Sequence, residues 1–220
     1  METLRSTVSG AKNPDPPRLG RPREDMVSPP ADSDYAFYRR LIHLKEGKRL
    51  MLRFLMESDR QNLIDLFQQA SWEDLWFFQY DLKNRSLLNY WLNHLDYRRV
   101  LPLVAINLED NQLVAAAALW RGKRTAQHIG EIKIFISRPF RNLGLGSKII
   151  DELIRLANQE NLHWLKAELV ADQKQLIKAL RNKGFQIRAT LEDFFMRQNG
   201  KTHDVLWMML CPSEGKHEAF

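Results

Sequence analysis

The 220-residue sequence contains one cysteine, Cys211, and no apolar run near the roughly 20 residues that a membrane-spanning helix needs. A single cysteine excludes an internal disulfide and a zinc site built on thiolate pairs. The first residues also lack the apolar core of a secretory signal peptide. These absences predict a protein of a reducing, cytoplasmic compartment, with no membrane partner and no metal.

Aromatic residues are missing from the first 34 positions, which hold six of the nine prolines. A stretch of this composition cannot bury enough apolar surface to offset the entropy lost on ordering. We therefore predict a disordered tail over residues 1–34 and one folded domain over residues 35–212. A short C-terminal tail follows over residues 213–220.

The formal net charge is +6 and the isoelectric point is about 9.5. Such a balance invites a nucleic-acid interpretation, but the five basic residues of the N-terminal tail face six acidic ones. The remainder shows neither a basic motif interleaved with aromatics nor a recognition-helix pattern. A nucleic-acid partner is therefore not expected, and a polyanionic small ligand is a sufficient reason for part of the excess charge.

Regular periodicities begin at Tyr35 and predict an α/β domain around one mixed sheet. The expected strands are Lys48–Phe54, Val100–Asn107, Gln112–Trp120, His128–Ser137, Trp164–Val170, Phe185–Arg197 and Asp204–Cys211. The expected helices begin near Ser58, Ser71, Gly146 and Asp172. Ser58 and Ser71 each have the spacing of a capping box, and Gly184 suits a left-handed helix end.

The segment Ile134–Ser147 carries the most information about a ligand. It runs from a strand rich in β-branched residues through a glycine-rich turn into an amphipathic helix. Backbone N–H groups at such a helix start lack intrahelical partners, and the helix dipole favours an anion. A phosphate-bearing ligand is expected. A dinucleotide fingerprint would need glycine at Ile149, and a Walker loop would need lysine directly after Gly146.

The pattern Arg141-x-x-Gly144-x-Gly146 resembles the loop with which GNAT-superfamily acyltransferases hold the pyrophosphate of acetyl-CoA. The element order from about residue 48 to 211 is similar to theirs as well. The resemblance implies a GNAT fold, with a mixed, mostly antiparallel sheet flanked by helices. It also implies an N-acetyltransferase, with acetyl-CoA as co-substrate and a primary amine on a small molecule or a protein lysine as acceptor.

A second, less specific resemblance favours the protein lysine. Tyr38–Glu73 is similar to the segment that leads into the GNAT domain of bacterial protein-lysine acetyltransferases, although Phe54 stands where that family usually has proline.

The first resemblance also implies which residues hold the cofactor. In GNAT proteins a strand splays from its neighbour, and its backbone N–H groups hold the acyl carbonyl and pantetheine. The matching positions here are Phe135, Ile136 and Ser137. The pyrophosphate positions are Arg141, Asn142, Leu143, Gly144, Leu145, Gly146 and Ser147. Many relatives also bind the cofactor with a helix asparagine, which is missing here. Gln173 stands close to its position and could substitute as a longer amide.

Glu131 is the candidate general base, because it lies on the same strand ten residues before Arg141, as in GNAT proteins that use a strand glutamate. A partly desolvated carboxylate has a raised pKa and can accept a proton near neutral pH. A second interpretation stays open. Strand alternation places Glu131 on the same face as Lys133, so the two could simply form an ion pair.

No tyrosine occurs after Tyr97, and Leu180 stands where many relatives carry the tyrosine that protonates the leaving thiolate. The proton could then come from water or another side chain. His128, His163 and His203 are candidates in principle, and ordinary strand or loop histidines otherwise. The departure also favours an alternative function, a CoA-binding regulatory module with little or no catalysis.

The segment Trp72–Tyr80 is unusually aromatic. It could line an acceptor site, form the contact of a homodimer, or belong to the core. Glu73 and Asp74 within it could attract a cationic amine or cap a helix.

Overall fold

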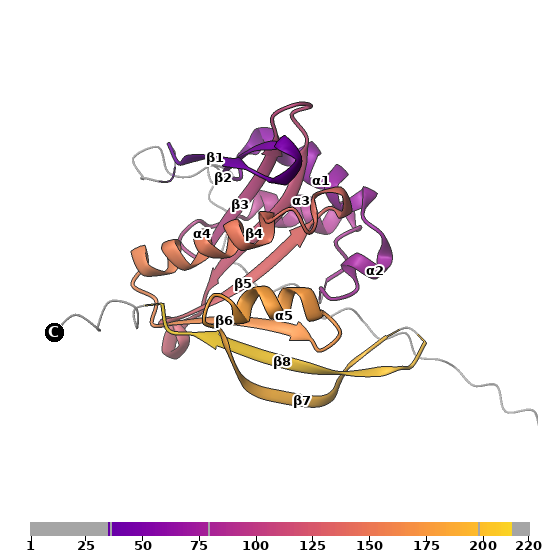
Figure 1. The fold of residues 1–220 in the computed structure, drawn as a ribbon, viewed down its shortest axis with the longest axis vertical. Helices are drawn as coiled ribbons and strands as arrows, with labels where there is room; N and C mark the ends of the chain where they lie inside the picture. Colours follow the sequence, from indigo (N-terminus) through magenta and orange to yellow (C-terminus); the bar gives the residue numbers. More distant parts are fainter. Residues whose placement is uncertain (1–34, 36, 79, 198, 213–220) are drawn as a thin grey trace, which may run out of the picture.

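The computed structural model describes residues 35, 37–78, 80–197 and 199–212 (Figure 1). The two predicted tails lie outside these residues. Eight strands form one sheet in the order β1-β2-β3-β4-β5-β6-β8-β7. Adjacent strands are antiparallel except β5 and β6, which are parallel. The predicted α/β class and the mixed, mostly antiparallel sheet are therefore confirmed.

The elements follow the predicted order. The strands are β1 (Arg39–His43), β2 (Arg49–Phe54), β3 (Val100–Asn107), β4 (Leu113–Arg121), β5 (Ile129–Ile136), β6 (Trp164–Val170), β7 (Gln186–Met196) and β8 (Thr202–Leu210). The helices are α1 (Arg60–Gln69), α2 (Trp72–Leu75), α3 (Arg85–Asn93), α4 (Leu145–Gln159) and α5 (Lys174–Arg181). Every predicted strand is present with ends within two residues of expectation. None of the described helices is long and apolar enough to cross a membrane.

Helices cover both faces of the sheet (Figure 1), and a cluster of buried side chains lies on each face. On one face α4 packs its apolar stripe, including Ile149, Leu153 and Leu156, against the strands, together with Leu180 of α5. On the other face α1 and α3 form a second cluster that includes Phe135 of β5. The central strand β3 is buried along its whole length. The C-terminal ends of β5 and β6 are not paired with each other, so a site can open between them.

Strand β1 was not predicted from the sequence. It pairs only with β2, and only Ile42 of its five residues is buried. An edge strand that is exposed on both faces carries no alternating pattern to read. A polar contact attaches it to the core, because the Arg40 guanidinium lies 2.8 Å from the buried Glu152 carboxylate on α4.

The predicted helix starts lie within two residues of the observed ones, but two of the caps differ. A 3-10 turn over Glu57–Asp59 leads directly into α1, and the capping carboxylate is that of Asp59, which accepts the Met56 N–H at 2.8 Å. The last helix begins at Lys174, because Asp172 instead faces His203 at 2.7 Å. The cap at Ser71 is confirmed, since its hydroxyl accepts the Asp74 N–H at 3.2 Å. The helix that it caps ends at Leu75, so the aromatic-rich region is divided between α2 and α3.

Candidate active site

The site begins where β5 and β6 separate. The two strands pair from Ile129 opposite Trp164 to Ile132 opposite Ala167, and no further. Beyond this point β5 continues to Ile136 and β6 continues to Val170. Their facing edges therefore diverge and leave backbone groups of β5 without a partner on β6, as the resemblance implies.

The direction of the β5 backbone groups follows from one hydrogen bond. The Ser137 N–H donates to the Val114 carbonyl of β4 at 2.9 Å. Antiparallel pairing alternates, so the Phe135 N–H also points to β4, while those of Ile134 and Ile136 point to the open edge. The prediction that Phe135 and Ser137 supply donors is therefore wrong in this conformation. The Ile136 N–H lies on the open edge, and so does that of Ile134.

The glycine-rich turn has the geometry of an anion site. Gly144 caps α4 with a φ of 93°, in the left-handed region, and Asn142 has a φ of 62°. The Lys148 N–H donates to the Gly144 carbonyl at 3.3 Å and closes the first turn of the helix. The N–H groups that precede it point out of the helix start, and they belong to Leu145, Gly146 and Ser147. These are the predicted pyrophosphate positions.

Arg141 links this turn to both β5 and α2. Its Nε donates to the Ile136 carbonyl at 2.8 Å, and its Nη1 lies 2.7 Å from a carboxylate oxygen of Asp74. Arg138 binds the other Asp74 oxygen at 2.7 Å and the Ser71 hydroxyl at 2.8 Å. The Asp74 carboxylate is thus already paired with two arginines beside the glycine-rich turn.

The two guanidiniums also determine the charge of Asp74. Burial of this carboxylate favours its neutral form, but hydrogen bonds from Arg141 and Arg138 outweigh burial and hold its pKa below the usual range. Asp74 is therefore ionised at neutral pH, and its charge offsets part of the positive field at the loop.

Glu131 lies before the point where the strands separate. Its carboxylate is 2.6 Å from Lys133 Nζ and 3.6 Å from Lys166 Nζ on β6. Burial alone would raise the pKa of Glu131, but these two ammonium groups outweigh it and hold the pKa below its usual range. The expected raised pKa is therefore wrong in direction, and the ion pair with Lys133 is present.

The candidate proton donors are spread over the sheet. Leu180 is buried and lines a small cavity between β5 and β6, where a tyrosine would stand in many relatives. His128 and His163 directly precede β5 and β6, at the N-terminal ends of these strands and so away from the end where the strands separate. His203 lies at the open end, in β8, with Nδ1 2.7 Å from Asp172.

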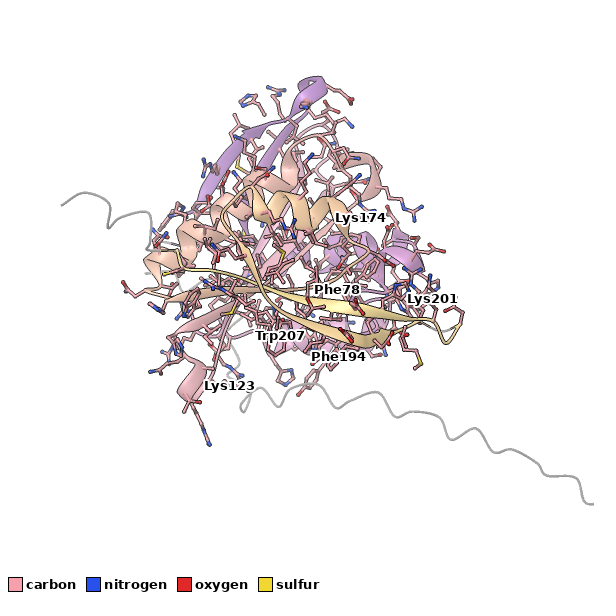
Figure 2. All side chains as sticks on the ribbon, turned by 60° about the horizontal axis from the view of Figure 1, so that its bottom comes forward. Phe78, Lys123, Lys174, Phe194, Lys201 and Trp207 are labelled. Atoms are coloured by element: carbon pink, nitrogen blue, oxygen red, sulfur yellow. The ribbon has the colours of Figure 1, made fainter. Side chains whose placement is uncertain are left out.

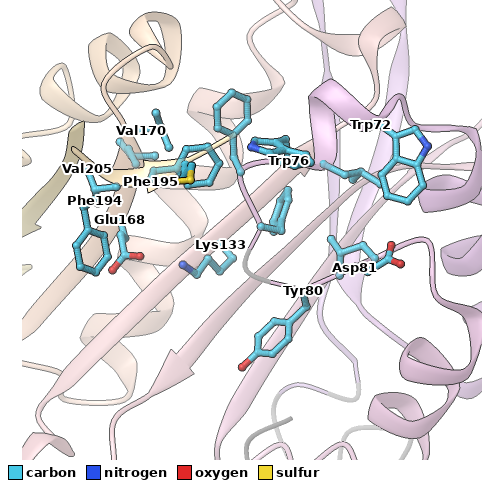
Figure 3. A pocket seen from close by; sticks show the side chains of 16 residues that line it. Trp72, Trp76, Tyr80, Asp81, Lys133, Glu168, Val170, Phe194, Phe195 and Val205 are labelled. Carbon is cyan, nitrogen blue, oxygen red and sulfur yellow. The ribbon is translucent and has the colours of Figure 1, made fainter. Parts of the chain in front are cut away.

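Two cavities lie along the separating strands. The smaller, of about 40 Å³, is lined by Gln173, whose Oε1 accepts the Val170 N–H at 3.0 Å. The larger, of about 820 Å³, opens beside it (Figure 3). Phe77 and Phe78 of the aromatic segment line both. The lining of the larger cavity also includes Lys133 and four side chains that were not singled out from the sequence, namely Glu168, Phe194, Phe195 and Met196.

The turn, the separated strands and the order of elements agree with a comparison of sequences. Residues 62–185, more than half of the chain, match the sequence model of the Acetyltransferase (GNAT) family. The chain belongs to this family. As a GNAT protein it is an acyl-CoA-dependent N-acetyltransferase.

Solved structures show the same GNAT fold. The GNAT domain of S. lividans PAT superposes with a TM-score of 0.66 at 16% identity, covering 79% of this chain and 96% of that one. The spermidine N-acetyltransferase from Vibrio cholerae, solved with CoA and spermine, gives 0.64 at 18% identity, covering 74% and 96%. The yncA protein from Salmonella typhimurium, solved with its cofactor acetyl-CoA, gives 0.60 at 20% identity, covering 75% and 95%.

The residues of this GNAT domain fit acetyl-CoA. Unpaired N–H groups at the start of α4 suit a pyrophosphate, and those of Ile134 and Ile136 suit an amide-bearing arm laid along β5. Arg141 sits between the two sets. Among the described residues, no group of three or more histidine, cysteine, aspartate or glutamate side chains could hold a metal ion.

The contact between Asp74 and Arg141 leads to a prediction about cofactor affinity. An Asp74→Asn variant is expected to bind CoA about 5- to 10-fold more tightly, because a carboxylate no longer competes with phosphate for two guanidiniums. Isothermal titration calorimetry with CoA measures this. Glu57→Gln, which removes a charge from a surface pair with Arg60, is the matched control and should change nothing. Weaker binding in Asp74→Asn would mean instead that Asp74 holds Arg141 in its binding position.

Proposed function

We propose that this enzyme transfers the acetyl group of acetyl-CoA to a primary amine by direct attack in the cleft between β5 and β6. The observation that carries the proposal is the end of β5–β6 pairing after Ile132. It leaves the Ile134 and Ile136 N–H groups on an open edge, and the glycine-rich turn that follows β5 leads into α4. A thioester whose phosphates lie at Gly144–Ser147 would extend along this edge toward the larger cavity.

The backbone of β5 supplies the electrostatic part of the reaction. As the amine nitrogen bonds to the acetyl carbon and the carbon–sulfur bond breaks, the carbonyl oxygen gains negative charge. An N–H of Ile134 or Ile136, already fixed in the strand, donates to that oxygen without reorganising. The products are an amide and the CoA thiol, and the nitrogen gives up one proton.

Glu131 is the proposed acceptor of that proton, directly or through water. The ammonium groups of Lys133 and Lys166 keep its carboxylate ionised at neutral pH. A carboxylate of low pKa is a weak base, so its contribution falls at the lower end of the usual range for acid–base catalysis. Leu180 cannot return a proton to the thiolate, and water at the open edge is the proposed donor.

Substitution of Glu131 tests this role. Glu131→Gln is expected to lower kcat about 10²-fold at pH 8 and to leave the KM for acetyl-CoA within about twofold. Because the pKa of Glu131 is lowered, its ionisation places no acidic limb between pH 6 and 8, and any limb there reports the amine. A Glu131→Gln enzyme that keeps full turnover at every pH would assign the base elsewhere.

The proposed acceptor group is a primary amine, which a small molecule and a protein lysine both carry. Release of CoA thiol in the presence of amines of both kinds, with the mass of each product, tests the proposal. Tight acetyl-CoA binding without thiol release from any amine would support the regulatory module instead. A homodimer formed through the aromatic segment stays a prediction from the sequence.

A further inference from the structure

The larger cavity has an unusually aromatic lining. Its volume of about 820 Å³ is in the range of sites for small organic ligands. Seven aromatic rings belong to the lining and form an aromatic wall, several of which Figure 3 labels. They are those of Trp72, Trp76, Phe77, Phe78, Tyr80, Phe194 and Phe195. Five leucine and valine side chains also belong to the lining.

The wall comes from two segments far apart in the chain. Trp76 and Phe77 directly follow α2, and β7 supplies Phe195. The Trp76 and Phe195 rings meet edge to face at 6.4 Å, and Phe77 stacks on Phe195 at 6.2 Å. These contacts hold the wall together from both sides. Phe194, 64% exposed, lies at its rim on the free edge of the sheet (Figure 2).

Charge in the cavity is sparse. The ionisable lining groups apart from Tyr80 are Lys133, Glu168 and Asp81. One Asp81 oxygen accepts the Lys83 N–H at 2.9 Å within its own turn. Glu168 lies on the floor close to Phe194 and Lys133 (Figure 3), where its Oε2 accepts the Trp207 indole N–H at 3.0 Å and lies 3.3 Å from Lys166 Nζ. Because this carboxylate is already paired, the cavity has little negative charge to offer a polyamine, whose several ammonium groups would need several carboxylates.

We propose that the acceptor is a small primary amine carried on an aromatic ring, with its ring among these side chains and its nitrogen toward β5 and Glu168. The inference rests on the proposed function. A lysine side chain would bury only the apolar surface of its methylene stem in the cavity. An aromatic ring would bury far more apolar surface there and would make edge-to-face contacts with the lining rings. Before it loses its proton, the ammonium also gains from the faces of the rings.

A panel of amines with acetyl-CoA tests the inference. We expect kcat/KM for 2-phenylethylamine to be at least about 10-fold higher than kcat/KM for spermidine or for a blocked pentapeptide with one lysine. Trp76→Ala and Phe195→Ala should each lower it about 10-fold for 2-phenylethylamine and leave the KM for acetyl-CoA unchanged. Phe194→Ala, at an exposed rim position, provides a variant that does not disturb the core. Phe37→Ala, at a side chain 83% exposed and outside the described lining, is the matched control.

The outcomes separate this inference from the proposed function. A preference for spermidine or the peptide overturns the aromatic acceptor and leaves acetyl transfer intact. If no amine is acetylated, the proposed function fails, and calorimetry decides the inference: binding of 2-phenylethylamine that weakens in Phe195→Ala supports it, and absence of binding overturns it.

Discussion

A Gly144→Val variant is expected to bind acetyl-CoA about 10³-fold more weakly. Gly144 adopts a φ of 93°, which a β-branched residue strongly disfavours. An added Cβ would meet nothing within 4 Å, so the effect is conformational rather than steric. A shifted backbone would turn away the N–H groups that start α4. Hydrogen bonds to charged groups are worth about 1.5–3 kcal/mol each, so loss of two gives an effect of this size.

Calorimetry with CoA measures the change, and another glycine provides the control. Gly200, in the β7–β8 turn, also has a positive φ, of 79°, with nothing within 4 Å of an added Cβ. Gly200→Val should cost comparable stability and leave CoA binding unchanged. Equal CoA affinity in wild type and Gly144→Val would contradict the assignment of the pyrophosphate to this turn.

An Asp59→Ala variant is expected to lower the free energy of unfolding by about 3–5 kcal/mol. Arg53 and Asp59 form a bidentate pair at 2.5 and 2.7 Å, with side chains only 12% and 5% exposed. The Asp59 carboxylate also accepts the Met56 N–H. Its removal leaves a buried guanidinium without its counter-charge and a backbone donor without its acceptor. Urea denaturation measures the loss.

Two further variants check the cause. Glu57→Ala breaks an exposed pair with Arg60 and should cost no more than about 1 kcal/mol. An Arg53→Met/Asp59→Ala double variant should recover part of the lost stability, because no unpaired charge stays buried. A loss below about 1 kcal/mol in Asp59→Ala would contradict the account of this pair as a buried unit.

Most of the sheet could be predicted because buried strands have a recognisable pattern of apolar residues in the sequence. β3 and β6 have the predicted ends, since turn residues or polar residues flank their apolar runs. β1 could not be predicted, because only Ile42 is buried in it. The capping residues of two helices could not be predicted, because each depends on a tertiary contact, Arg53 with Asp59 and Asp172 with His203.

The glycine-rich turn of the candidate site could be predicted because it is local: strand, turn and helix follow one another within Ile134–Ser147. The aromatic lining of the larger cavity could not, because Trp76 and Phe195 meet only in the folded chain. The direction of the β5 N–H groups required the register with β4. The lowered pKa of Glu131 required the position of Lys166 on the neighbouring strand.

The most direct test of acetyl transfer in this cleft uses acetyl-CoA labelled in its acetyl group. The full-length protein is incubated with labelled acetyl-CoA and 2-phenylethylamine, spermidine or the lysine pentapeptide, and the products are followed by mass spectrometry. The account predicts one labelled acetyl group on the nitrogen of an amine, one CoA thiol released per amide, and loss of both in Gly144→Val. Labelled acetyl-CoA that stays intact with every amine, while wild-type protein binds it, would contradict the account.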